Sequence, residues 1–401
     1  MRYKSGYKAE NISTHYDWSS WGQFSDAVEM CNNNGACRKL DSGVMCPSYR
    51  VTMEEKDLVR GRANTLRLAL SNQLPKDSFV SKDMFETMEL CVSCKACQRE
   101  CPMSVDMAKM KSEFLSHYYR KFYMSLKDRV ISNMPKLIWL LKISNPMINI
   151  LNKLPIFSQM IEWFGFSSKR SLPVVENQEP LKEIYNDQVN LEKKVILFAD
   201  TFNINFEIKN LMYAIKVLNK FGYQAIIPSF QNDNLDRPLC CGRTYISLGQ
   251  LDKAKMELER FTKYVSDNGY NELPVVGIEP SCLLTFNDEF KSFSHLKNRS
   301  KIKNEFFLLE EFVLNEIKNG NKIKYKDFNK NVLIHGHCHQ KSQNRIKGLT
   351  NLLNELKIKN SRIESSCCGM AGSFGYSSKH YEVSKKMAYL SLILAINNST
   401  E

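Results

Sequence analysis

The chain carries the stretch CVSCKACQRECP at residues 91–102, in which four cysteines are spaced C-x2-C-x2-C-x3-C and a proline follows the last one. Three thiolates two residues apart wrap one face of an iron–sulfur cubane, while a fourth before a proline ligates the other cluster of two-cluster proteins. A structural zinc site normally takes two separated pairs of ligands, a spacing that this compact motif lacks. The motif therefore predicts an iron–sulfur cluster and, with it, electron transfer.

A second cysteine group lies upstream of this motif. Cys31, Cys37 and Cys46 match its first, third and fourth positions, and Asn34 occupies the second. If ligands cross between the two motifs as in two-cluster proteins, Cys46 joins the first three cysteines of the 91–102 motif. The predicted 4Fe–4S ligands are then Cys46, Cys91, Cys94 and Cys97.

This crossing leaves three thiolates for a second cluster, those of Cys31, Cys37 and Cys101. Three thiolates suit a 3Fe–4S cluster, or a 4Fe–4S cluster with one ligand that is not cysteine. The alternative is a single cluster, with the remaining cysteines buried as small apolar residues.

Composition favours an intracellular protein with metal sites. The chain has 401 residues, enough for two or three domains. Its 13 cysteines are odd in number and bunched in motifs, which favours metal binding in a reducing compartment over a disulfide framework. The start of the chain lacks the apolar stretch of a secretory signal, and the longest apolar run, residues 137–141, is too short to span a membrane. We therefore expect a cytoplasmic protein, either free or at the inner face of a membrane.

The net charge of +13 does not by itself indicate a nucleic-acid-binding protein. Proteins that bind nucleic acids gather Lys and Arg into a patch that contacts phosphates. Here the lysines are spread through the whole chain, many of them beside Asn and Ile. Nucleic acid is therefore not an expected partner.

Residues 1–118 are expected to form an α-helical ferredoxin-type domain, and residues 119–185 a basic amphipathic helical linker. Three prolines, Pro135, Pro146 and Pro155, are expected to cut the linker into short helices. Its basic charge and aromatic residues suit either an anionic membrane surface or packing against a partner subunit or the neighbouring domain. The aromatic residues are Trp139, Phe157, Trp163 and Phe164.

From residue 186 the pattern changes to alternating strands and helices, which predicts parallel sheets. Apolar strands are predicted at residues 194–199, 224–228, 274–278 and 331–334. The tripeptide Cys-Cys-Gly (CCG) occurs in each half of this region, at residues 240–242 and 367–369. We expect two pseudo-repeated α/β CCG domains, residues 186–325 and 326–401, whose CCG loops meet at a composite site.

The CCG loops add thiols and imidazoles that are candidate metal ligands. Three interpretations stay open for them: an unusual iron–sulfur cluster, a zinc site, or a redox-active thiol pair. His335, His337 and His339 alternate after a strand, so His337 is expected to point away from the other two. Arg243 and Lys341 are expected either to hold a carboxylate or quinone oxygen or to be solvated loop charges. The candidate ligands are Cys240, Cys241, Cys282, Cys338, Cys367, Cys368, His337 and His339.

Taken together, the motifs resemble the iron–sulfur and CCG region of FAD-linked 2-hydroxyacid oxidoreductases. Members include D-lactate, glycolate and D-2-hydroxyglutarate dehydrogenases, and the iron–sulfur subunit of anaerobic glycerol-3-phosphate dehydrogenase is a more distant relative. The stretches that carry the resemblance are residues 31–50, 60–70, 91–115, 237–249, 275–289, 335–342 and 366–376.

The resemblance implies a division of labour between chains. No dinucleotide-binding motif is apparent here, and the similarity is to the carboxyl-terminal half of long enzymes whose amino-terminal half binds FAD. The chain is then either a separate subunit or a fragment, and FAD is expected on a partner dehydrogenase subunit only. Electrons from that flavin are expected to reach a quinone or cytochrome-type acceptor through the clusters, so no catalytic residue is expected here.

Two other functions remain as alternatives. One is a scaffold whose cysteines hold zinc and whose CCG halves recruit a partner without redox turnover. The other is a thiol or disulfide reductase that acts through the CCG cysteines. Each alternative uses the same cysteines for a different purpose, so the arrangement of the thiols distinguishes these functions.

Overall fold

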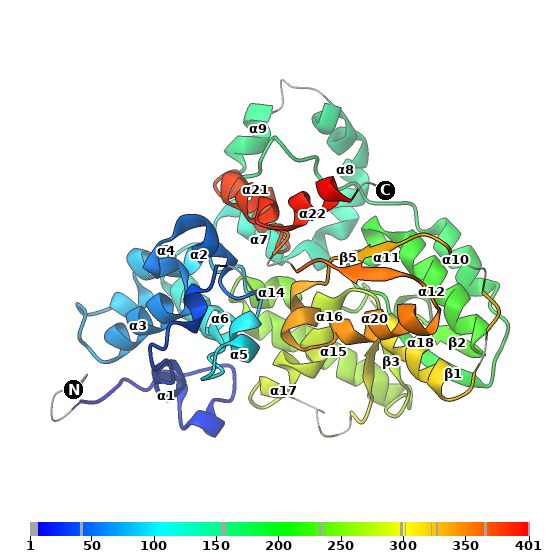
Figure 1. Cartoon of the computed structure of the whole chain (residues 1–401), viewed down its shortest axis with the longest axis horizontal. Coiled ribbons are helices and arrows are strands. Elements are labelled where there is room, and N and C mark those ends of the chain that lie inside the picture. Colours follow the sequence, from blue (N-terminus) through cyan, green and yellow to red (C-terminus); the bar gives the residue numbers. More distant parts are fainter. Residues whose placement is uncertain are drawn as a thin grey trace.

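The computed structural model describes residues 7–40, 43–153, 158–231, 235, 237–296, 300, 302–321, 323–325, 328–364 and 367–399. Pro155 and Phe157, both expected in the linker, lie outside these residues. Figure 1 shows a helical amino-terminal part beside an α/β part, with a group of helices from the linker and the carboxyl terminus above both.

The amino-terminal part is helical, as the spacing of its apolar residues predicts. The helices are α1 (Phe24–Glu29), α2 (Pro47–Thr52), α3 (Val59–Leu70), α4 (Lys82–Glu89), α5 (Ala96–Glu100) and α6 (Met107–Lys121). Short 3-10 turns lie between them at Ser19–Trp21, Ala36–Arg38, Glu55–Asp57 and Ser78–Val80. Asp106 begins α6 by accepting a hydrogen bond from the Lys109 amide at 3.1 Å, an N-cap that fixes where the helix starts after the cysteine loop.

The linker differs from the expected set of short helices. Its helices are α7 (Leu126–Ser132), α8 (Met134–Lys153), α9 (Ser158–Trp163) and α10 (Glu179–Asn186). Pro135 lies in the first turn of α8, where a missing amide proton costs nothing. Pro146 lies inside α8, and the helix continues through it, so the expected break there is wrong. No helix among the described residues is long and apolar enough to cross a bilayer.

Four parallel strands in the order β2-β1-β3-β4 form the main sheet. They are β1 (Lys193–Phe198), β2 (Tyr223–Ile226), β3 (Val275–Gly277) and β4 (Phe306–Leu308), the first three close to the predicted strands. The helices of this half are α11 (Asn203–Phe206), α12 (Ile208–Lys220), α13 (Pro228–Gln231), α14 (Arg243–Ser247), α15 (Leu251–Asp267), α16 (Pro280–Asn287), α17 (Glu289–Ser292) and α18 (Leu309–Lys318).

Both faces of this sheet are buried. Val195 and Leu197 of β1 belong to a core that includes α12, whereas Ile196 and Phe198 belong to a second core that continues into the amino-terminal helices. This alternation is the period of two that a strand imposes on its side chains. One face of the sheet therefore shares its hydrophobic core with the cysteine-bearing part, which fixes the two parts against each other.

The carboxyl-terminal half forms a smaller unit than the preceding half, which contains the main sheet. It has two paired parallel strands, β5 (Val332–Ile334) and β6 (Asn360–Arg362). Its helices are α19 (Cys338–Ser342), α20 (Ile346–Glu355), α21 (Tyr381–Tyr389) and α22 (Leu392–Asn398), with a 3-10 turn at Phe374–Tyr376. Each half contains a parallel sheet, but the sheet of the first half has four strands and that of the second has two. The expected pseudo-repeat of two complete domains therefore stays a prediction.

Candidate iron–sulfur site

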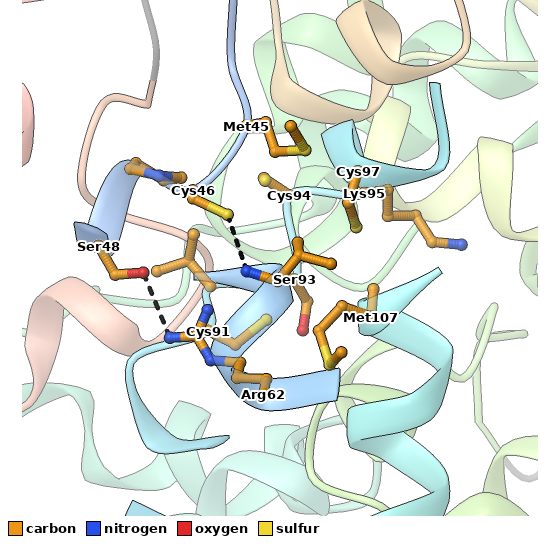
Figure 2. Close-up of a pocket in the computed structure, with 14 residues that line it drawn as sticks. Met45, Cys46, Ser48, Arg62, Cys91, Ser93, Cys94, Lys95, Cys97 and Met107 are labelled. Carbon is orange, nitrogen blue, oxygen red and sulfur yellow. Dashed lines mark hydrogen bonds between the residues drawn. The ribbon is translucent and has the colours of Figure 1, made fainter. Parts of the chain in front are cut away.

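Four cysteines from two segments of the chain line one small cavity. Cys46 precedes α2, Cys91 and Cys94 lie in the loop after α4, and Cys97 lies in α5. Figure 2 shows their side chains around one space. The structure thus brings together the four residues that the crossed arrangement predicts as 4Fe–4S ligands, and a set of four thiols fits such a cluster.

The backbone of the cysteine loops makes this grouping possible. Cys46, Ser93 and Lys95 have φ angles of 54°, 50° and 61°, in the left-handed region that non-glycine residues rarely adopt. Each reverses the direction of the chain beside a ligand, so cysteines close in sequence face the same cavity. The Val59 amide of α3 donates a hydrogen bond to the Cys46 sulfur at 3.3 Å, which ties α3 to the site.

The thiols sit in a water-poor environment. Burial raises the pKa of Cys46 to about 12, and it raises the pKa values of Cys94 and Cys97 well above the ordinary range. The neighbouring thiols raise all three further, because each would be a like charge when ionised. These cysteines therefore keep their protons until a bound metal displaces them.

The second predicted set is brought together in part. Cys31 and Cys37 are buried and lie close enough for the Cys31 thiol to raise the pKa of Cys37, although burial of Cys37 is the larger cause. Cys101 is buried in the same hydrophobic core, and its assignment to this pair stays a prediction. The Asn34 amide oxygen accepts a hydrogen bond from the Ala36 amide at 2.8 Å, so this side chain helps to shape the turn.

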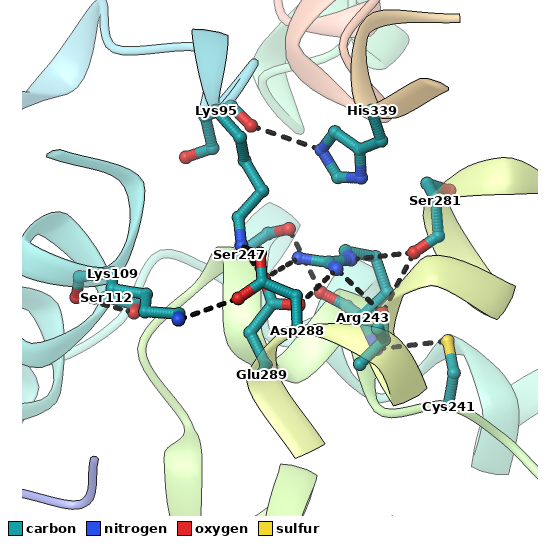
Figure 3. A network of polar contacts seen from close by, with 12 residues as sticks. Lys95, Lys109, Ser112, Cys241, Arg243, Ser247, Ser281, Asp288, Glu289 and His339 are labelled. Atoms are coloured by element: carbon teal, nitrogen blue, oxygen red, sulfur yellow. Dashed lines mark hydrogen bonds and ion pairs between the residues drawn. The ribbon is translucent and has the colours of Figure 1, made fainter. Parts of the chain in front are cut away.

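A buried network of ion pairs connects the cysteine loop to the first CCG half (Figure 3). Lys95, between Cys94 and Cys97, is 2% exposed and pairs with Asp288 and, at 2.9 Å, with Glu289. Burial alone would lower the pKa of Lys95, but the two carboxylates raise it above its ordinary value. Lys95 is thus a buried ion-pair residue within the ligand loop, a role that its sequence position did not indicate.

Arg243 completes this network. Its guanidinium donates to both carboxylate oxygens of Glu289, at 2.7 and 2.9 Å, and to the Thr285 hydroxyl at 2.7 Å. The Arg243 side chain is only 12% exposed, so its interpretation as a solvated loop charge is wrong. Burial would raise the pKa of Glu289, but Arg243 and Lys95 hold it well below the usual range. The carboxylate and both cations are therefore charged together.

The first CCG loop holds three thiols in one buried group. Cys241 is hydrogen-bonded to both Cys240 and Cys282, and all three are at most 3% exposed. Gly242 has a φ of 78°, and its amide donates to the Cys240 sulfur at 3.4 Å. Gly369 of the second CCG has a φ of 80° and donates to Cys367 at 3.3 Å. The two tripeptides therefore share one local geometry.

The second CCG group comprises Cys338, Cys367 and Cys368. Cys367 is hydrogen-bonded to the other two thiols, and the bond from Cys367 holds the pKa of Cys368 well below its ordinary value. Cys338 lies near the cavity described above, because its charge would raise the pKa of Cys94. Among the described residues, no group of three His, Cys, Asp or Glu side chains is arranged to hold a single metal ion. Metal binding by the CCG residues stays a prediction.

The histidines do not alternate along a strand as expected. β5 ends at Ile334, and His337 is the N-cap of α19, where its Nδ1 accepts a hydrogen bond from the His339 amide at 3.1 Å. His339 is buried, and its Nε2 lies 3.2 Å from the Ser93 carbonyl of the cysteine loop. His337 Nε2 lies 3.7 Å from Glu279 of the first half. The two histidines thus connect α19 to the cysteine loop and to the first CCG half.

Comparison with known proteins agrees with this site. Residues 27–105, which hold both cysteine groups, match the family model of the 4Fe-4S dicluster domain. D-2-hydroxyglutarate dehydrogenases from Pseudomonas putida and Escherichia coli are 23% and 21% identical over 91% and 90% of the chain. A subunit of the anaerobic glycerol-3-phosphate dehydrogenase of Escherichia coli is 22% identical over 60% of the chain and 60% of its own length. No solved structure matches.

The chain spans about two fifths of the length of the D-2-hydroxyglutarate dehydrogenases that it matches, since 39% of each is covered. These relatives are oxidoreductases or subunits of them, and they agree with the resemblance inferred from the cysteine and CCG motifs. The chain thus carries a 4Fe-4S dicluster domain at residues 27–105, and most of its length is similar to part of the D-2-hydroxyglutarate dehydrogenases, in agreement with the resemblance to the iron–sulfur and CCG region of 2-hydroxyacid oxidoreductases.

Proposed function

We propose that the chain is the iron–sulfur electron-transfer part of a FAD-dependent 2-hydroxyacid dehydrogenase. The observation that carries this proposal is the set of four thiols that line one cavity. A 4Fe–4S cluster bound there would accept and release single electrons. Cys46, Cys91, Cys94 and Cys97 would hold it.

The residues around the cavity have defined tasks in this proposal. The Val59 amide donates to the Cys46 sulfur, which favours the thiolate form of this ligand. Met45 and Met107 line the cavity together with Val59 and keep water away from the sulfurs. Lys95 holds the ligand loop against the α/β part through its buried ion pairs. These contacts fix the thiols before a cluster binds.

Further components of the proposal concern the rest of the redox chain. Cys31, Cys37 and Cys101 would hold a second cluster of the 3Fe–4S or 4Fe–4S type, which the match to a dicluster family supports. FAD and the hydroxy acid would bind to a partner dehydrogenase subunit, and the acceptor would be a quinone or a cytochrome-type protein. The relatives named D-2-hydroxyglutarate dehydrogenase support a 2-hydroxy acid as the electron source.

Anaerobic purification from the native host tests the partner. A tagged chain is expected to bring down a flavoprotein, and adding D-2-hydroxyglutarate, D-lactate or glycolate to this complex is expected to reduce the clusters, seen as loss of visible absorbance. The matched control is Cys94→Ala, which lacks a ligand of the first cluster. If dithionite reduces the clusters of a complex that contains no flavin, and none of the hydroxy acids does, the proposed electron source is incorrect.

We also propose that α8 and α9 contact an anionic membrane surface. Trp139, Ile143, Met147 and Ile150 are exposed on one face of α8, and Trp163 of α9 is 79% exposed. In residues 119–170, nine basic residues stand against two acidic ones, Asp128 and Glu162. Aromatic rings with surrounding cations favour the interface of a charged bilayer.

Sedimentation with lipid vesicles tests this contact. The chain is expected to sediment with vesicles that contain phosphatidylserine and to remain in solution with neutral phosphatidylcholine vesicles. The variant Trp139→Ser/Trp163→Ser is expected to lose most of this binding, because it removes the two rings that enter the interface. Equal sedimentation of the wild type and the variant with anionic vesicles would rule out this surface.

A further inference from the structure

Helix α3 carries two arginines that face different cysteine groups. Arg60 and Arg62 are two residues apart, which places them about 200° apart around a helix with 3.6 residues per turn. Arg62 lines the cavity of the predicted 4Fe–4S ligands (Figure 2). Arg60 instead lies beside the second cysteine group, because a Cβ atom at Gly35, two residues before Cys37, would lie 3.6 Å from its guanidinium. One helix thus directs one cation to each cysteine group.

Arg62 is held rigidly in the wall of the cavity. It is 2% exposed, and its guanidinium donates to the Thr87 carbonyl at 3.0 Å and to the Ser48 hydroxyl at 3.3 Å. Its carboxylate partner is Asp57, at 3.5 Å. Arg62 and Cys46 line the same cavity, together with Cys91, Cys94 and Cys97. The field of this arginine therefore reaches a ligand sulfur.

Arg60 occupies a more exposed position with a closer counter-ion. Its side chain is 21% exposed, and it donates two hydrogen bonds to Glu55, at 2.6 and 2.8 Å. The Arg60 backbone amide also donates a hydrogen bond to Cys37, so this residue adjoins the second cysteine group. Water and the close carboxylate screen this arginine more strongly than Arg62, because exposed pairs interact weakly in a high dielectric.

Gly61 helps to position both arginines, because it allows α3 to pack closely against the preceding turn. A Cβ atom at this position would lie 2.0 Å from the Glu55 carbonyl oxygen, so only glycine lets α3 approach the preceding turn. That turn supplies both counter-ions, Glu55 and Asp57. The two arginines, their carboxylates and the two cysteine groups are therefore positioned by one short segment of chain.

We propose that Arg62 and Arg60 set the reduction potentials of the two clusters separately, with Arg62 acting on the cluster of Cys46, Cys91, Cys94 and Cys97. This inference rests on the proposed function, since it requires that the thiols bind clusters. One-electron reduction adds a negative charge to a cluster, and a fixed buried cation stabilises that charge. Arg62 therefore raises the potential of its cluster, and Asp57 lowers it. Arg60 has a smaller effect on the cluster of Cys31 and Cys37.

Potentiometric titration followed by EPR tests the inference on the full chain with reconstituted clusters. Arg62→Gln is expected to shift the potential of the 91–97 cluster to more negative values and to leave the other unchanged. Asp57→Asn is expected to shift the same potential in the opposite direction, and Arg62→Lys to keep it close to the wild-type value. Arg60→Gln is expected to cause a smaller negative shift, confined to the second cluster.

The outcomes separate an electrostatic role from a structural one. Shifts in the same direction for Arg62→Gln and Asp57→Asn would indicate loosening of the site and would overturn the inference, as would an unchanged potential in both. If the Arg62→Gln variant does not retain its cluster, the sign of the potential shift in Asp57→Asn alone decides between the electrostatic and the structural role. If only one cluster is present, Arg60→Gln must leave it unchanged. A wild-type chain without any EPR-active cluster would overturn the proposed function as well.

Discussion

Replacing Cys46 with alanine is expected to abolish the cluster of the 91–97 loop, although this residue lies 45 positions before Cys91 in the sequence. Cys46 lines the same cavity as the loop cysteines, and its sulfur is held there by the Val59 amide. Without Cys46, one iron of the cubane has no thiolate ligand, and that iron is the first to be lost. We expect the EPR signal of the reduced 4Fe–4S cluster to disappear and the iron content to fall by at least one iron per chain.

Cys101→Ala is the matched control for this experiment. Cys101 belongs to the same C-x2-C-x2-C-x3-C motif as the loop ligands, but it does not line their cavity. The Cys101→Ala substitution is expected to leave the 4Fe–4S signal of the loop intact and to alter only the second cluster. If Cys101→Ala abolishes the loop cluster while Cys46→Ala retains it, the four adjacent cysteines ligate one cluster and the crossed arrangement is incorrect.

Replacing Glu289 with alanine is expected to lower the free energy of unfolding by about 3–5 kcal/mol, the usual cost of removing one partner from a buried ion pair. Glu289 is 1% exposed and is shared by Lys95 and Arg243. Without it, Arg243 loses two charge-assisted hydrogen bonds in a place that water does not reach. Urea unfolding followed by circular dichroism measures the loss.

Glu272→Ala is the control, because it removes an ion pair of similar length at the surface. Glu272 and Lys303 are 3.2 Å apart, but their side chains are 78% and 71% exposed. Exposed pairs of this kind contribute little to stability. Equal losses for the two variants would show that the Lys95, Glu289 and Arg243 network does not hold the cysteine loop against the α/β part.

Short sequence patterns predict the features that depend only on residues close together in the chain, such as strand β1 and the iron–sulfur domain. The apolar run around β1 predicted a parallel strand, because a strand buried on both faces has no polar alternation. The spacing of the cysteines predicted an iron–sulfur domain, which the dicluster match confirms for residues 27–105. The ligand roles of individual cysteines stay predictions, although the structure places four of them around one cavity.

The features that the sequence did not indicate depend on distant partners. Lys95 resembles any loop lysine until Asp288, 193 residues later, is placed beside it. Arg243 likewise owes its burial to Glu289, on a different helix. Pro146 was expected to end a helix, but a single missing hydrogen bond did not end α8. Long-range pairing and tertiary support decide such cases, and neither is visible in a short window of sequence.

Anaerobic reconstitution with iron and sulfide, followed by metal analysis and EPR of the dithionite-reduced protein, tests the central claim most directly. Iron and acid-labile sulfide in the amounts of at least one 4Fe–4S cluster, together with a low-temperature EPR signal that Cys46→Ala removes, are the predicted result. A protein that instead retains stoichiometric zinc and shows no paramagnetic signal after reduction would contradict the claim that this chain transfers electrons.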